Sequence, residues 1–180
     1  MLFRKRRRPA GQETYGPARR KSSTASLTKG SPDCNRLHSE LVRPVRAETD
    51  VTLFAGITGD FSDTHINDQY MKEKSNLGRR IAHGALLVGY MSTVSTISIA
   101  HVIHKEGLSD FPVSSGYDRV RFLKPVLLGD TITAHYTVDI VDKERGRSIA
   151  KVEVLNQHGE TVAVAEHIMR WAKKLSSATS

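Results

Sequence analysis

An acid and an imidazole lie five residues apart near the middle of the chain: Asp60 follows Gly59, and His65 comes after a short polar stretch. Residues 60–67 have no regular hydrophobic period, so we expect a turn or loop, where functional groups commonly sit on a rigid scaffold. A carboxylate and an imidazole that converge on one water molecule can activate it near neutral pH, because one group accepts a proton and the other returns one. Asp60 and His65 are therefore the candidate acid/base pair.

A second candidate half-site begins at His83-Gly84, where the longest apolar segment of the chain opens. Backbone N–H groups at a helix N-terminus lack intrahelical acceptors, and glycine lets a ligand approach them closely. Gly84 is thus predicted to bind a carbonyl or thioester oxygen, and His83 to shape the turn into the helix as a supporting residue. An acid/base pair facing such an oxyanion site suits the addition of water to a double bond conjugated to a carbonyl.

Spacing alone leaves other interpretations open. Asp60 suits an Asx turn after glycine, and a single histidine such as His65 is often a hydrogen-bonded structural residue. Loop residues Asp60, Asp63, His65 and Asp68 also suggest a metal site, but a helical pair of histidines four residues apart is missing from them. We predict neither a metal nor a cofactor.

The net charge of +8 comes entirely from the N-terminal segment: residues 1–38 carry ten basic and two acidic residues, and the remainder is neutral. This segment has little to bury, so we expect a disordered tail, with a cleaved organellar presequence or a polybasic arm as alternatives. We do not expect nucleic acid as a partner, nor a membrane span. With one cysteine, Cys34, no intrachain disulfide can form. The expected compartment is the cytoplasm, or the mitochondrial matrix if the tail is a presequence.

Hydrophobic periodicity predicts an α+β domain over residues 39–172, followed by a polar tail over 173–180. The apolar segment from Gly84 to about residue 104 predicts a long buried helix, although its β-branched second half also suits a strand. The other expected elements are a strand near 42–46, a helix over 50–57 ended by Gly59, a helix over 69–74 capped by Asp68, and antiparallel strands over 117–123, 131–141, 148–155 and 161–171.

Two motifs, GDFSDTHIND from Gly59 and GRRIAHGALL from Gly78, resemble the MaoC-like dehydratases, the (R)-specific enoyl-CoA hydratases of the hot-dog fold. The later VRFLKPVLLGDTITAHYTV also looks like that family, and the resemblance covers about residues 41–172. It implies a long central helix wrapped by a curved antiparallel sheet, in a protein that generally dimerises. One departure is that Ser62-Asp63 replaces the usual Asn-Pro, which removes the rigidity of proline from the loop.

The resemblance also implies roles for individual residues. Asp60 and His65 match the catalytic pair that holds the water, Gly84 matches the backbone donor to the thioester oxygen, and Ser92 falls where relatives place a serine near the site. Ser62 and His83 are possible supporting residues. The implied activity is a hydro-lyase acting on an acyl-CoA or acyl-carrier-protein thioester. The alternatives are an acyl-CoA thioesterase of the same fold and a non-catalytic acyl-thioester-binding subunit of a heterodimer.

Overall fold

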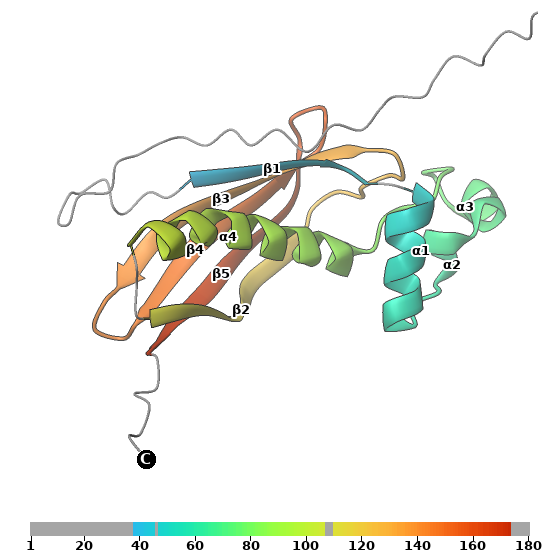
Figure 1. The fold of residues 1–180 in the computed structure, drawn as a ribbon. Helices are drawn as coiled ribbons and strands as arrows, with labels where there is room; N and C mark the ends of the chain where they lie inside the picture. Colours follow the sequence, from blue (N-terminus) through green and yellow to red (C-terminus); the bar gives the residue numbers. More distant parts are fainter. Residues whose placement is uncertain (1–37, 46, 107–109, 174–180) are drawn as a thin grey trace, which may run out of the picture.

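The computed structural model describes residues 38–45, 47–106 and 110–173, which form four helices and one five-stranded antiparallel sheet (Figure 1). The helices are α1 (Ala47–Thr58), α2 (Asp63–Ile66), α3 (Asp68–Lys74) and α4 (Gly84–Glu106). The strands are β1 (His38–Pro44), β2 (Asp110–Phe122), β3 (Thr131–Asp142), β4 (Arg147–Leu155) and β5 (Thr161–Lys173). Their order across the sheet is β1-β3-β4-β5-β2. The predicted α+β class is confirmed.

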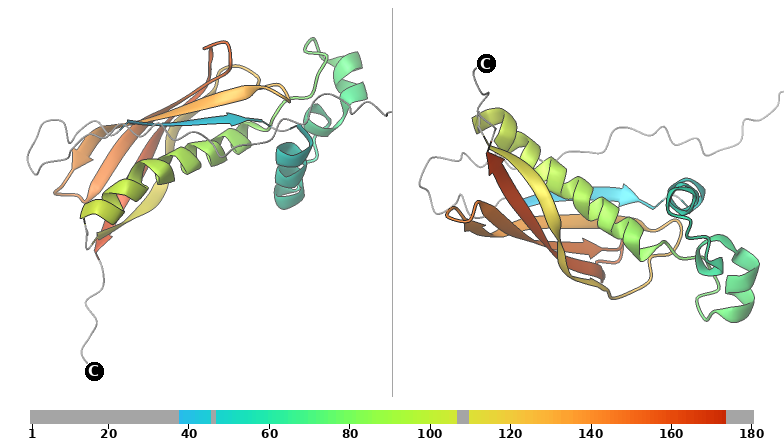
Figure 2. Two further views of the ribbon diagram at one scale, coloured as in Figure 1. Left: turned by 45° about the horizontal axis from the view of Figure 1, so that its top comes forward. Right: turned by 90° about the horizontal axis from the view of Figure 1, so that it is seen from below.

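Helix α4 is the long central helix that the apolar segment predicts, and it lies along one face of the curved sheet (Figure 2). Leu87, Met91 and Val94 follow one another at helical spacing and are at most 3% exposed. They pack in one core cluster with residues of the sheet. This stripe of buried side chains continues the helix through the β-branched second half, so the alternative of a strand there is wrong.

Alternating burial on strands β3, β4 and β5 builds the other side of this core. In β3 the buried residues are Ile132, Ala134, Tyr136 and Val138, with partly buried residues between them. The period of two places these four side chains on the face that meets α4. The predicted strands over 131–141, 148–155 and 161–171 match β3, β4 and β5 to within two residues at each end.

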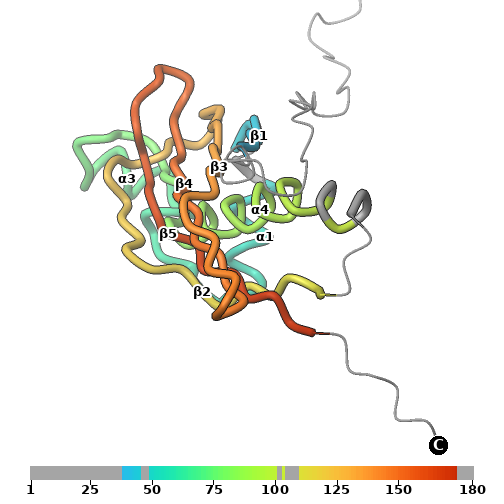
Figure 3. The backbone as a smooth tube through the Cα atoms, turned by 90° about the vertical axis from the view of Figure 1, so that its left-hand side faces the viewer, coloured from blue at the N-terminus to red at the C-terminus, as the bar shows by residue number. Residues whose placement is uncertain are grey.

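Strand β2 begins at Asp110, seven residues before the predicted strand over 117–123. Pro112 and Gly116 are residues typical of a turn. However, β2 is an edge strand, where the missing N–H of a proline is tolerated. Register shifts interrupt its pairing with β5 twice, and Arg119 has a φ of 52° within the second one. Such irregularities bend a strand. Figure 3 shows β2 and β1 at opposite edges of the sheet.

Helices α1, α2 and α3 gather beyond the end of the sheet, near the N-terminus of α4 (Figure 1). Gly59 ends α1 with a φ of 80°, as predicted. The expected loop over residues 60–67 instead contains the single turn α2. The predicted cap of the next helix is also wrong: the side chain of Asn67, rather than Asp68, accepts the hydrogen bond from Tyr70 N. An amide oxygen serves here as well as a carboxylate, and sequence does not separate two adjacent capping residues.

The predicted tails, residues 1–38 and 173–180, fall outside the described residues apart from His38 and Lys173, the terminal residues of β1 and β5. Both tails therefore stay predictions, as does the domain boundary over 39–172. Within the described ranges, no helix combines the length and apolar character that crossing a membrane would require.

A buried histidine lies in the sheet beneath α4. His167 is fully buried, and its two ring nitrogens lie 3.0 Å from Tyr136 Oη and 2.9 Å from Ser114 Oγ. The ring also stacks on Tyr117, with 4.5 Å between ring centroids. Burial lowers the pKa of His167 from 6.5 to about 4, because an imidazolium would lose its hydration there.

This depressed pKa predicts a loss of stability in mild acid. The imidazole of the unfolded chain binds a proton more tightly than the buried ring does. His167 therefore leaves the free energy of unfolding undiminished above about pH 6.5 and lowers it as the pH falls from 6.5 toward 4. The free energy of unfolding should decrease by up to about 3 kcal/mol from this residue alone. Denaturant titrations of the wild type and of His167→Gln between about pH 7 and pH 4.5 measure the effect. An equal decrease in both proteins would contradict the prediction.

Candidate active site

The carboxylate of Asp60 lies in the turn after α1, with its side chain 51% exposed. Oδ1 accepts a hydrogen bond from Ser62 N at 3.3 Å, so the residue does form the Asx-type turn that its position after glycine suggests. Oδ2 lies 3.9 Å from His83 Nε2. The structural and chemical interpretations of Asp60 are therefore compatible, because each uses a different carboxylate oxygen.

His65 belongs to α2, and the segment that leads into α4 holds its ring. Its Nδ1 lies 2.8 Å from the carbonyl oxygen of Ile81, while Ile81 N donates to Thr64 O at 3.1 Å. Because a carbonyl only accepts, Nδ1 of His65 carries the proton in this contact. In the neutral imidazole, Nε2 then has the lone pair that a general base requires.

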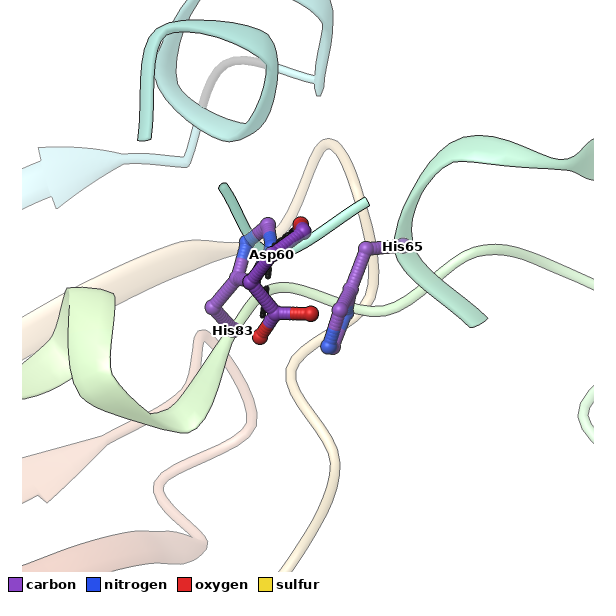
Figure 4. Close-up of side chains that lie close together, drawn as sticks. All are labelled: Asp60, His65 and His83. Carbon is purple, nitrogen blue, oxygen red and sulfur yellow. Dashed lines mark hydrogen bonds and ion pairs between the residues drawn. The ribbon is translucent and has the colours of Figure 1, made fainter. Parts of the chain in front are cut away.

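His83 immediately precedes α4 and is 1% exposed. Its Nε2 lies 3.0 Å from the backbone oxygen of Asp60. Its ring stacks on His65, with centroids 3.8 Å apart, and meets Phe54 on α1 at 4.8 Å. Figure 4 shows the side chains of Asp60, His65 and His83 gathered at one place, although they come from three separate segments. The structure thus brings together three of the predicted site residues.

Gly84 is the first residue of α4, directly after His83. The first N–H groups of a helix have no intrahelical acceptor and carry the positive end of the helix dipole. The ring of Phe122, at the end of β2, covers the Cα of Gly84, and a Cβ added there would lie 2.7 Å from its nearest carbons. Phe122 is 52% exposed, so its ring forms a wall beside the helix N-terminus.

Ser62 and Ser92, the two serine candidates, do not belong to the cluster of Asp60, His65 and His83. The hydroxyl of Ser62 pairs with Thr64 Oγ1 of α2 at 3.0 Å. Asp63, the second residue of the departure from Asn-Pro, accepts a hydrogen bond from Asn67. Ser92 is exposed on α4, about 12 Å along the helix axis from Gly84 at 1.5 Å per residue. A supporting role for either serine stays a prediction.

Asp60, His65 and His83 each offer one donor atom within 4.8 Å of the others, a spacing that a divalent metal ion would accept. The orientation is less suitable. The two imidazoles lie face to face at an interplanar angle of 30°, and Nε2 of His83 already faces a carbonyl oxygen. Histidine ligands of one ion instead direct their in-plane lone pairs at a common point. This orientation therefore gives little support to a metal site.

Sequence reasoning did not identify three residues that shape the site: Phe54, Ile81 and Phe122 contact His83, His65 and Gly84 respectively. Each is a single apolar residue whose side chain carries no reactive group. Nothing in its spacing distinguishes it from a core residue, because its role depends on the partner that the fold supplies.

The fold and the site together define a hot-dog protein. The (R)-hydratase from A. caviae superimposes with a TM-score of 0.63 over 79% of this chain and 98% of its own, at 19% identity. The family of the MaoC-like domain matches residues 28–162. The chain therefore belongs to the MaoC-like family of hydratases and dehydratases, as the motifs at Gly59 and Gly78 predict.

Two curated relatives match in sequence. The (R)-specific enoyl-CoA hydratase of Rhodospirillum rubrum is 34% identical over 92 residues, which are 51% of this chain and 57% of the relative. Nodulation protein N of Rhizobium leguminosarum bv. viciae is 26% identical over 91 residues, which are 51% of this chain and 54% of the relative. The chain thus spans about half the length of the curated relatives it matches.

The close approach of Phe122 predicts the effect of a methyl group at Gly84. Gly84→Ala should destabilise the protein by about 1 kcal/mol, because the half-exposed ring of Phe122 must turn away from the added methyl group. Phe122→Ala in the same chain should remove most of that loss, which a double-mutant cycle of denaturant titrations measures.

Gly89 on the same helix is the matched control, since an added Cβ there meets nothing within 4 Å. Gly89→Ala should be neutral or stabilising by up to about 1 kcal/mol. Equal effects of alanine at Gly84 and Gly89 would contradict the proposed contact.

Proposed function

We propose that this protein is an (R)-specific enoyl-CoA hydratase, or 3-hydroxyacyl-thioester dehydratase in the reverse direction. It adds water reversibly and on one face to a trans-2-enoyl thioester carried by CoA or an acyl-carrier protein. The observation that carries the proposal is the placement of the His65 imidazole: Ile81 O holds its Nδ1 at 2.8 Å, and a ring nitrogen of His65 lies within 4.8 Å of a carboxylate oxygen of Asp60. Membership of the MaoC-like family supports it.

In the proposed reaction a water molecule lies between Asp60 and His65. Nε2 of His65 accepts one proton of the water while its oxygen bonds to the β-carbon, and Asp60 accepts a hydrogen bond from the second proton. The α-carbon then takes the proton back from His65. Because one imidazole both removes and returns the proton, hydroxyl and hydrogen add to the same face of the double bond.

As oxygen adds, the electron pair of the double bond moves toward the thioester and its oxygen becomes negative. In this proposal the N–H of Gly84, the first residue of α4, donates a hydrogen bond to that oxygen, assisted by the helix dipole. Such a donor acts mainly on the transition state, where the charge is largest. Phe122 beside Gly84 supplies an apolar wall that keeps water away from the enolate-like oxygen.

Removal of either reacting group should abolish turnover. Asp60→Asn and His65→Gln should each lower kcat/KM for crotonyl-CoA by a factor of about 100 or more, because general acid/base catalysis supplies at least that much. The assay follows loss of the enoyl absorbance. Asp63→Asn, three residues from Asp60 and outside the cluster, is the matched control and should stay within about threefold of wild type. Full activity in both site variants would refute the assigned roles.

The product distinguishes hydration from the alternatives. With crotonyl-CoA we expect 3-hydroxybutyryl-CoA of R configuration and no free thiol, because Asp60 and His65 direct water at the β-carbon. Release of free CoA without hydration would instead identify a thioesterase. Binding of the acyl-CoA with neither product would identify a non-catalytic subunit. Chiral chromatography and a thiol reagent measure the two products in one reaction.

We further propose that the protein works as a homodimer, in the cytoplasm unless the basic tail directs it to mitochondria. Large apolar side chains on and after α1 support an assembly: Leu53, Ile57 and Phe61 are 60%, 84% and 56% exposed. Side chains of this kind are often covered in an oligomer. Light scattering coupled to size-exclusion chromatography should give twice the 20.0 kDa mass of the chain. A monomer throughout the micromolar range would contradict a dimer.

A further inference from the structure

His83 is the one member of the clustered triad to which the proposed reaction assigns no step. It is nevertheless the most buried of the three, and it lies where the two half-sites meet. Its backbone precedes Gly84, its Nε2 reaches Asp60 O, and its ring covers one face of His65. The side chain of His83 therefore contacts both members of the acid/base pair, and its backbone is joined by a peptide bond to Gly84, the proposed oxyanion donor.

The hydrogen bonds of His83 limit what it can do. Nε2 faces a backbone oxygen at 3.0 Å, so it must be the protonated nitrogen. Nδ1 is buried without a hydrogen-bond partner among the described residues. A second proton there would have no acceptor within those residues, and the proton on Nε2 is already donated to Asp60 O. The ring is thus fixed as a donor to the chain and has no proton to give to a substrate.

We propose that His83 is a positioning residue, which sets the separation and orientation of Asp60 and His65 for the reaction proposed above. Its hydrogen bond holds the backbone of Asp60, and its ring is the surface against which the His65 imidazole is held flat. Phe54 packs near the same ring and keeps it in place. Because the ring belongs to the segment that begins α4, it keeps the acid/base pair in register with the N–H of Gly84.

Two substitutions separate the two contacts. His83→Gln keeps an N–H close to the place of Nε2 but removes the ring, and His83→Phe keeps the ring but removes the donor. We expect each to lower kcat by about tenfold or more with KM for crotonyl-CoA changed by less than about threefold, since misplacement of about 1 Å costs up to a hundredfold in rate. His83→Ala, which removes both contacts, should show the largest loss.

The control pair is His135→Gln and His135→Phe. His135 lies between the buried residues Ala134 and Tyr136 of β3, so it is on the sheet face away from α4. These variants should keep kcat within about twofold, because the contacts of the partly buried His135 are with His38 and Glu40 of β1 and not with the residues around His83. A purely structural role of His83 would lower the melting temperature and leave kcat per folded molecule unchanged, and that result would overturn the proposal.

A second measurement does not depend on activity. The Nδ1 proton of His65, bonded to Ile81 O, should give a slowly exchanging imidazole signal by NMR, identified by its loss in His65→Gln. We expect His83→Phe to preserve that signal and His83→Gln and His83→Ala to broaden it or accelerate its exchange. An unchanged signal in all three variants would overturn the role of the stack. If the wild-type protein hydrates no enoyl thioester, the proposed function fails, and this signal still decides whether His83 holds His65.

Discussion

The segment from Arg80 to Gly84 makes hydrogen bonds on both sides, and the position of the site depends on them. On one side Ile81 exchanges hydrogen bonds with Thr64 and His65, both of α2. On the other side Ala82 N donates to Val126 O, and Ile81 pairs with Leu127 in an isolated β-bridge. A short extended segment thus joins the small helices to the connection between β2 and β3, immediately before α4 begins.

These hydrogen bonds fix the position of the segment that carries Asp60 and His65. Loop residues such as Asp60 have few neighbours of their own, and a catalytic pair requires placement to a fraction of an ångström. The rigid parts here are α4 and the sheet. They share one hydrophobic core, to which α4 contributes Leu87 and Met91. Through His83 and Ile81 the loop takes its position from that core. The substitution of Ser62-Asp63 for Asn-Pro is compatible with this, since Ser62 pairs with Thr64 in place of the rigidity of proline.

Two histidines are buried in separate places within the described part of the chain. His83 lies at the start of α4, whereas His167 lies in the sheet with Tyr136 and Ser114 as hydrogen-bond partners. His167 is fully satisfied and has its pKa lowered by burial, as expected of a structural histidine. His83 keeps one unpartnered nitrogen next to reactive groups. The same residue type thus stabilises the fold in one place and organises the chemistry in the other.

The sequence by itself determined the class of fold and the chemically active residue types. The apolar period after Gly84 predicts α4, alternation predicts β3 to β5, and Asp60, His65 and Gly84 stand out by type and spacing, because each of these signals is local. Only the tertiary structure decided how the half-sites meet. The stack of His83 on His65, the wall of Phe122 over Gly84 and the early start of β2 depend on partners up to 38 residues apart in sequence or on a place at the sheet edge. No local pattern encodes such pairings, since they form between segments that only the tertiary fold brings together.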